Sequence, residues 1–474
     1  MAEINTKSTS KALLKNTGII AIGQLSTKIL SFLLLPLYTA LLSSTEYGLI
    51  DLLSTYAAFI TVIVGLQLSQ AIFRFLATNR NDEEKIGKIC SSIFFISILL
   101  VLIYAVIFAV IQLYIKLDYK WFLFLNVIAS IFLQTVSGMI RGLGDNGLYA
   151  FGNFISTSVI LVLNVIALTV MHKGVDAMLI SNIIGPFVGG IVICIFGKLH
   201  RYIRLTWFSK NDIKVMLAYA IPLVPNELSW SLIHSSDRMI ISNVLSIAAN
   251  GLIAVASRFS YVYTTAFSIF NISWTEQVVI HYKDDGGPKY ISDMFNRMIT
   301  FFGCFAIGII ACMPFVYDVF INEKYSEGYG LVPFYMIAVF FNAVIGMISA
   351  IYLVHNETKK VAISTGVAAT INVIINLALV KIIGVYAAPV SSICGYLTIS
   401  LWRVIDVNKR YCALKMDRTK IFIMLFMLLI TMATYRIRIL TINIAVLVTV
   451  AVISFVLNKD FILELKSIII KRGK

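Results

Sequence analysis

The sequence predicts an all-α integral membrane protein with about fourteen transmembrane helices. Only 13% of its 474 residues are charged and 59% are hydrophobic, whereas a soluble chain carries charges at about 25% of its positions. The apolar residues come in blocks of about twenty or more, long enough to cross roughly 30 Å of hydrocarbon. No polar stretch long enough for a soluble domain separates these blocks. The chain therefore lacks the polar surface that a soluble fold needs.

Hydropathy places the expected helices in order along the chain. The spans lie near residues 17–42, 49–77, 89–115, 120–140, 148–171, 176–197, 215–244, 252–280, 295–320, 331–354, 361–381, 385–405, 420–435 and 438–457. The first apolar block follows a polar, basic start and is too long for the core of a signal peptide. We therefore expect no cleavable signal.

The distribution of Lys and Arg predicts the orientation. With the N-terminus inside, 28 of the 39 Lys and Arg residues fall on the cytoplasmic side and 7 on the opposite side. Such a bias orients membrane helices with the basic loops in the cytoplasm. We expect a multi-pass protein with both termini cytoplasmic. The net charge of +15 then reflects topology, and no nucleic-acid partner is expected.

The two halves of the chain resemble each other. Residues 155–166 (ISTSVILVLNVI) and 363–374 (ISTGVAATINVI) are identical at seven of twelve positions, at an offset of 208. The pair Leu42-Ser43 precedes Gly48-Leu-Ile50 as Leu245-Ser246 precedes Gly251-Leu-Ile253, at an offset of 203. A repeat of about 205 residues holds six helices. Because six is even, both copies have the same orientation in the membrane.

Parallel repeats predict two six-helix lobes related by an axis along the membrane normal, with the substrate path between them. We expect an N-lobe over residues 1–209 and a C-lobe over residues 210–418. Residues 419–474 have no counterpart and form two extra C-terminal helices with a cytoplasmic tail.

Polar residues within the first span lie on one face of the helix. Gln24, Lys28 and Ser31 follow i, i+4, i+7 spacing. An ionised side chain at a helix centre costs roughly 2.5–3.5 kcal/mol on insertion scales, so it is a functional candidate by default. We expect this stripe to line a wet cavity; the alternative is a structural cation bonded to nearby carbonyls.

The seventh span is the richest in polar residues. Glu227, Ser231, His234 and Arg238 form one stripe at i, i+4, i+7 and i+11, and Asp237 lies about 100° away. Glu227, His234 and Asp237 are the candidates for ion coupling or gating. Pro222 and Pro225 predict a kink near the cytoplasmic end, because proline removes backbone donors.

Two further arginines complete the cationic set. Arg258 in the eighth span is expected at the depth of Arg238, and both are candidates for binding an anionic substrate. The alternative is a buried lock in which Asp237 pairs with an arginine and no ligand binds. Arg74 lies within one turn of a helix end, where anchoring by snorkelling is an equal alternative.

Several chemistries lack their motifs. The sequence has no GxxxxGK[ST] loop for ATP and no HExxH. The six cysteines lack CxxC spacing, so neither a disulfide framework nor a metal site is expected. We expect no cofactor beyond a coupling ion, sodium or proton, if transport is coupled.

A resemblance to a known family follows from three motifs. Residues 41–48 (LLSSTEYG) resemble the LS-x-x-E-Y-G signature of Wzx-type polysaccharide flippases, in the superfamily of lipid II flippases and multidrug (MATE) exporters. Pro222 with the run 235–238 (SSDR), and Asn372 with Asn376 and Gly384, resemble later parts of the same pattern. The likeness covers essentially the whole chain.

The resemblance implies a flippase in the bacterial inner membrane, not an enzyme. Its cargo would be an undecaprenyl-pyrophosphate-linked glycan for O-antigen or capsule, moved by rocking lobes around a cationic lumen, with a polysaccharide polymerase as a possible partner. Lys28, Arg74, Arg238 and Arg258 would meet the pyrophosphate. A MATE-type drug exporter is the alternative, since Glu227 and Asp237 are acidic. A membrane polymerase fits less well, because every outer loop is short.

Overall fold

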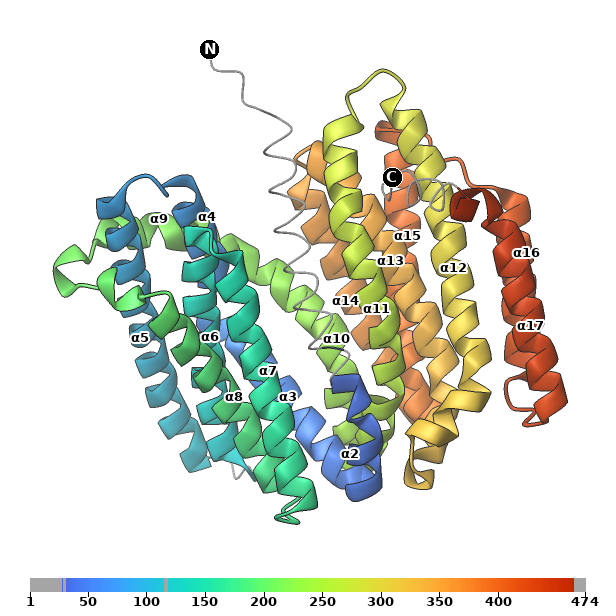
Figure 1. The fold of residues 1–474 in the computed structure, drawn as a ribbon, viewed down its shortest axis with the longest axis horizontal. Coiled ribbons are helices and arrows are strands. Elements are labelled where there is room, and N and C mark those ends of the chain that lie inside the picture. Colours follow the sequence, from blue (N-terminus) through green and yellow to red (C-terminus); the bar gives the residue numbers. More distant parts are fainter. Residues whose placement is uncertain (1–27, 29–30, 115–117, 464–474) are drawn as a thin grey trace, which may run out of the picture. The chain divides into compact units, whose positions relative to one another are not determined.

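A computed structural model of the protein describes residue 28 and residues 31–114 and 118–463. Every regular element within these ranges is helical (Figure 1). In chain order the α-helices are α2 (Leu35–Leu41), α3 (Ser44–Gly65), α4 (Leu68–Thr78), α5 (Glu83–Tyr114), α6 (Lys120–Leu143), α7 (Asn146–Thr169), α8 (Val175–Phe196), α9 (Lys210–Ala220), α10 (Val224–Val244), α11 (Ile247–His281), α12 (Gly287–Phe320), α13 (Val332–Val354), α14 (Thr358–Ile383), α15 (Ala387–Arg410), α16 (Arg418–Thr434) and α17 (Leu440–Leu457).

The helices have the length and composition of membrane spans. Among the described residues, nine helical stretches are long and apolar enough to cross a bilayer, and one of these, Lys359–Arg410, holds both α14 and α15. The predicted all-α membrane protein is confirmed. The count of fourteen stays a prediction, because most of the expected first span, 17–42, lies outside the described residues.

The chain divides into two compact units, Met1–Met239 and Ile240–Lys474. The boundary falls inside α10, which follows α9 through a short 3-10 turn. The lobes expected over residues 1–209 and 210–418, with 419–474 as an appendage, stay a prediction.

The order of packing is the same in both units. In the first unit α7 packs against α8, while α6 packs against α4, α5 and α8. In the second unit α14 packs against α15, while α13 packs against α11, α12 and α15. The helices of the second unit that correspond by sequence order thus make the corresponding contacts. This shared order is the arrangement that an internal repeat produces.

The motif at residues 41–48 forms the start of α3. The Ser43 hydroxyl accepts a hydrogen bond from the Glu46 backbone N–H, and the Glu46 carboxylate accepts one from the Ser43 backbone N–H at 2.8 Å. This capping box satisfies N–H groups that lack partners at a helix start. The matching Ser246 caps α11 by accepting from the Ala249 N–H at 3.0 Å. Part of the sequence signature is therefore a helix-start signal used in both halves.

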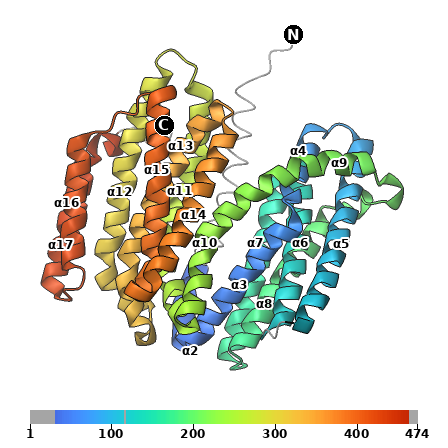
Figure 2. The ribbon, with the colours of Figure 1, turned by 180° about the vertical axis from the view of Figure 1, so that it is seen from behind.

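The kink expected at Pro222 and Pro225 is present. The 3-10 turn η3, Ile221–Leu223, separates α9 from α10, and Figure 2 shows α10 leaving α9 in a new direction. Pro222 lacks the N–H that a continuous α-helix would use there. Because of this turn, the helix that carries the polar stripe, α10, has a different direction from α9.

The last two helices pack at one edge of the second unit, beside α12 (Figure 1). Tyr329 and Tyr435 join them to the segment before α13. Each hydroxyl donates to the other residue's carbonyl oxygen at 2.9 Å, and the rings stack with centroids 4.2 Å apart. Two reciprocal bonds between buried tyrosines hold the end of α16 in one position.

Candidate functional site

A break in the second helical span shapes the first unit. The sequence predicted one helix over residues 49–77, and this was wrong: α3 ends at Gly65 and α4 begins at Leu68. Leu66 and Gln67 between them have φ angles of 46° and 54°. This left-handed conformation costs about 1–2 kcal/mol for a residue with a Cβ atom, and such strain persists only where the surrounding structure holds it. α11, the corresponding helix of the second unit, is continuous.

Polar residues from α4 and α6 converge beyond this break. α4 contributes Ser69, Gln70 and Phe73, all within its first two turns. α6 contributes a stripe at i, i+4, i+7 and i+11, which places its members on one face of the helix. The stripe consists of Ser130, Gln134, Ser137 and Arg141.

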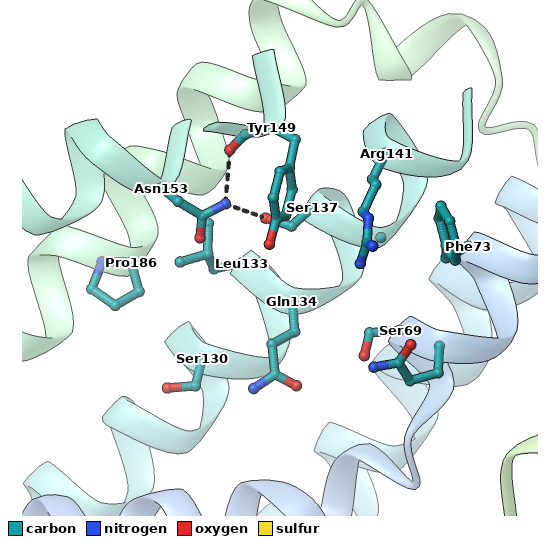
Figure 3. Close-up of a pocket in the computed structure, with 12 residues that line it drawn as sticks. Ser69, Phe73, Ser130, Leu133, Gln134, Ser137, Arg141, Tyr149, Asn153 and Pro186 are labelled. Carbon is teal, nitrogen blue, oxygen red and sulfur yellow. Dashed lines mark hydrogen bonds between the residues drawn. The ribbon is translucent and has the colours of Figure 1, made fainter. Parts of the chain in front are cut away.

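These residues line a polar pocket inside the first unit, which we call the α4–α6 pocket. Its volume is about 360 Å³, and Tyr149, Asn153 and Pro186 of α7 and α8 complete its wall. Figure 3 shows the side chains of Gln134, Ser69 and Arg141 bordering the same space. Asn153 closes one side: its amide donates to the Tyr149 carbonyl oxygen at 2.8 Å and to the Ser137 hydroxyl at 3.4 Å.

Arg141 gives the pocket its charge. Its guanidinium lies 4.3 Å from the centroid of the Phe73 ring and 5.7 Å from that of Tyr149. No Asp or Glu is among the described residues that line the pocket. Among the described residues, Arg141 forms no ion pair with an Asp or Glu side chain within 4.0 Å. A cation whose face is covered by an aromatic ring keeps its N–H edges for a ligand in the plane.

The neutral side chains of the pocket also have hydrogen-bonding capacity to spare. Within the described ranges, the side chains of Ser69, Gln70 and Gln134 make no hydrogen bond to protein. Each amide offers two N–H donors and one acceptor oxygen, and each hydroxyl both donates and accepts. The pocket thus combines one positive charge with several free donors and acceptors.

The predicted residues of the first span are only partly described. Gln24 lies outside the described residues. Lys28 is helical with an exposed side chain, and Ser31 is half-buried at the start of the continuous description. Arg74 lies on α4 outside the pocket lining, with its guanidinium 4.3 Å from the Tyr219 ring centroid. Its role in substrate binding stays a prediction.

The polar stripe of α10 includes an ion pair that the sequence did not indicate. Arg238 Nε lies 2.6 Å from Oδ2 of Asp51 on α3, and the two side chains are only 14% and 12% exposed. Asp237 is buried at 4% exposure, Glu227 is exposed, and the side chain of His234 lies outside the described part. The coupling role of these three residues stays a prediction.

In the second unit, Arg258 lies on α11 and is half-buried, 5.4 Å from the Tyr261 ring centroid. A second arginine, Arg403 on α15, is fully buried at 1% exposure. Its N–H groups donate to the hydroxyls of Ser349, Ser364 and Thr365 and to the Val361 carbonyl oxygen, at 2.7–3.2 Å. Arg403 therefore ties α13, α14 and α15 together through neutral oxygens.

The second unit also contains an apolar crevice of about 400 Å³. It lies between α16 and the helices α12, α13 and α15, and its described lining is apolar except for Ser400. Gly303 lets α12 approach α16 closely: a Cβ atom there would lie 2.9 Å from the Met424 sulfur. A crevice of this kind suits a hydrocarbon chain.

Sequence reasoning missed Asp51, Arg141 and Arg403. Arg141 and Arg403 lie near the cytoplasmic ends of expected spans, where basic residues are common whatever their role. The stripe 130–134–137–141 has the spacing of the stripe recognised in α10, and it was the signal that could have revealed the pocket. Asp51 sits alone in an apolar block, and nothing local indicates its partner 187 residues away.

The fold belongs to a known class of membrane transport proteins. It is similar to a lipid II flippase, MurJ, in an inward closed conformation, with a TM-score of 0.71 and 16% identity over 94% of this chain and 99% of that one. It is also similar to an inward-facing multidrug resistance MATE family transporter of the MOP superfamily, with a TM-score of 0.64 and 14% identity over 82% and 98%. An outward-facing MATE transporter gives 0.58 and 17% over 86% and 97%.

These similarities identify a multi-pass transporter fold rather than an enzyme fold. The chain belongs to the polysaccharide biosynthesis protein family, whose pattern it matches over residues 13–275. The resemblance to polysaccharide flippases and their superfamily is therefore confirmed. A comparison with curated protein sequences found no match.

Proposed function

We propose that the protein is a flippase that moves an undecaprenyl-pyrophosphate-linked oligosaccharide from the cytoplasmic to the outer leaflet of the bacterial inner membrane. The observation that carries the proposal is the α4–α6 pocket, polar and positively charged, inside a chain of the polysaccharide biosynthesis family. The guanidinium of Arg141 can bind the anionic group of such a head group, and the neighbouring polar side chains can bond its hydroxyls. The product would serve O-antigen or capsule assembly, with a polysaccharide polymerase as a partner.

The cargo has a second chemistry, its polyprenyl chain. The apolar crevice beside α16 supplies a surface on which such a chain loses little by leaving the bilayer. We assign the polyprenyl chain of the cargo to this crevice. Transport would proceed by alternating access of two lobes, residues 1–209 and 210–418, with both termini in the cytoplasm.

The remaining cationic residues would meet the pyrophosphate. Lys28, Arg238 and Arg258, with Gln24 and Ser31 beside Lys28, form the proposed lumen, and Arg74 lies near its cytoplasmic mouth. The pair of Arg238 with Asp51 restricts Arg238 to a fixed geometry, which favours oriented binding over a mobile charge. Sodium or protons would couple through Glu227, His234 and Asp237.

A MATE-type drug exporter is the second candidate, favoured by the fold similarity and by the acidic residues of α10. A carboxylate near the site attracts an organic cation, whereas an arginine repels it. The α4–α6 pocket offers an arginine and, among its described lining, no carboxylate. This supports an anionic or neutral polar cargo for the pocket.

The test is transport by purified protein in liposomes. A fluorescent polyprenyl-pyrophosphate oligosaccharide would be placed in one leaflet, and its appearance in the other measured with a membrane-impermeant quencher, under imposed sodium or proton gradients. We expect translocation well above that of protein-free vesicles. Translocation at the protein-free rate, together with uptake of organic cations, would replace the flippase by the exporter.

A further inference from the structure

The α4–α6 pocket has the chemistry of a selective sugar site. We propose that it is a subsite for one sugar residue that carries a carboxylate. The proposal rests on the proposed function, since the sugar would be part of the cargo. It adds a preference: glycans with an acidic residue in reach of Arg141 would bind better than neutral ones.

The charge of the pocket supports an anionic ligand. Arg141 is the one charged side chain of the described lining, and its guanidinium packs on Phe73 rather than on an acid. Other arginines nearby are engaged elsewhere: Arg80 donates from Nε to the Gly142 carbonyl oxygen at 2.7 Å, and Arg74 lies on Tyr219. A guanidinium binds a carboxylate or phosphate through two parallel N–H bonds.

The number of charges separates a sugar acid from the pyrophosphate. A pyrophosphate carries at least two negative charges, whereas the pocket offers one guanidinium. One carboxylate on a sugar ring would be neutralised by Arg141 alone. The lone charge therefore fits a sugar acid better.

The neutral groups suit the rest of a sugar ring. Ser69, Gln70 and Gln134 have no hydrogen bonds to described protein, and all three line the pocket that Arg141 borders. Figure 3 shows Ser69 and Gln134 beside this space. Sugar hydroxyls both donate and accept, so side-chain amides and hydroxyls match them in either direction. A volume of about 360 Å³ holds a single sugar residue with its ordered water.

The direct experiment measures binding of small probes to the full-length protein in lipid nanodiscs. Saturation-transfer NMR would compare methyl β-D-glucuronide with methyl β-D-glucoside. We expect the glucuronide to bind about tenfold more tightly, the effect of one charge-assisted bond pair. Arg141→Gln should abolish the difference and Arg141→Lys should keep part of it. Arg204→Gln is the control, because it removes another arginine that stacks on an aromatic ring, Trp207. It should leave the preference for the glucuronide unchanged.

Three outcomes would overturn the subsite. One is equal binding of both glycosides by the wild type, a result that needs no variant to fold. A second is an unchanged preference in Arg141→Gln. The third is inorganic pyrophosphate binding that depends on Arg141 while neither glycoside binds, which would make the pocket a pyrophosphate site.

The transport assay separates this proposal from the function it rests on. If lipid-linked glycans cross at the protein-free rate while glucuronide still binds through Arg141, the flippase proposal fails and the subsite is supported. If acidic and neutral glycans cross equally, and Arg141→Gln slows neither, the flippase stands and the subsite is overturned.

Discussion

Arg238 on α10 and Asp51 on α3 form an ion pair of 2.6 Å within the first unit, although 187 residues separate them. Both side chains are largely buried. The charge of α10 that the sequence assigned to substrate binding is thus held by an acid from another helix. Whatever binds Arg238 must do so beside this carboxylate.

The first prediction concerns this pair. Asp51→Asn keeps the shape of the side chain but removes the charge next to Arg238. Breaking a buried ion pair from one side costs about 3–5 kcal/mol, so we expect a large fall in the melting temperature of the detergent-solubilised protein. Glycan export in cells should fall with it.

A charge exchange is the control for this prediction. Asp51→Arg combined with Arg238→Asp restores opposite charges across α3 and α10, and it should recover part of the lost stability. Equal melting temperatures for wild type and Asp51→Asn would show that the pair contributes nothing.

The second prediction concerns the arginine buried in the second unit. Thr365→Ala removes one acceptor from the Arg403 guanidinium, to which the Thr365 hydroxyl is bonded at 3.1 Å. We expect the protein to lose about 1–3 kcal/mol of stability, because a buried charged donor loses a partner. Calorimetry or thermal unfolding by fluorescence would measure the loss.

Thr370→Ala is the matched control on the same helix. The Thr370 side chain is exposed and, among the described residues, bonds only to the carbonyl oxygen of Gly366, so its loss should be within about 0.5 kcal/mol. Similar effects of the two substitutions would mean that the contacts of Arg403 are not what stabilises α13, α14 and α15.

The third prediction concerns the apolar crevice beside α16. Gly303→Phe places a large ring next to Met424, in the crevice of about 400 Å³. We expect the purified variant to retain several-fold less undecaprenyl phosphate, as measured by native mass spectrometry. Gly308→Phe is the control, because in the described part of the chain no heavy atom lies within 4 Å of a Cβ atom built there. Equal retention by the two variants would exclude the crevice as the site of the chain.

The fourth prediction concerns pH and the loop before α14. Glu357 accepts hydrogen bonds from Lys360 Nζ at 2.8 Å and from the Tyr411 hydroxyl at 3.0 Å. Lys360 first, and then Tyr411, lower the pKa of the Glu357 carboxyl from its ordinary value of 4.5. A carboxyl with a lowered pKa stabilises the fold above its unfolded pKa, and the contribution disappears as pH falls through the folded pKa.

Glu357→Gln should therefore lower the melting temperature slightly at neutral pH, because the side chains of Glu357 and Lys360 are 34% and 29% exposed and water screens their attraction. The difference from wild type should hold from pH 7 down to about 4.5, the ordinary pKa of this carboxyl, and should shrink as the pH falls further through the lowered folded pKa. A difference that does not shrink below pH 4.5 would mean that the charge of Glu357 does not matter.

Much of the architecture followed from the sequence alone. Runs of apolar residues define where helices cross a membrane, because a bilayer interior leaves backbone groups no partner outside the helix. Nearly all the spans expected in the described part appear as helices, and prolines 222 and 225 mark the observed kink. The repeated motifs at residues 43 and 246 were also recognisable in the sequence, because the start of a helix depends on residues close to it in the chain.

Only the tertiary structure decided which polar residues meet. No proline marks the break at Leu66 and Gln67 in the sequence. Both residues adopt a left-handed conformation that the local sequence disfavours, so packing holds them in it. Asp51 forms an ion pair with Arg238, and Ser69 lines the same pocket as Arg141, although each pair is far apart in the sequence. Local patterns show which side of a helix is polar, but the partner of that side depends on how distant helices pack.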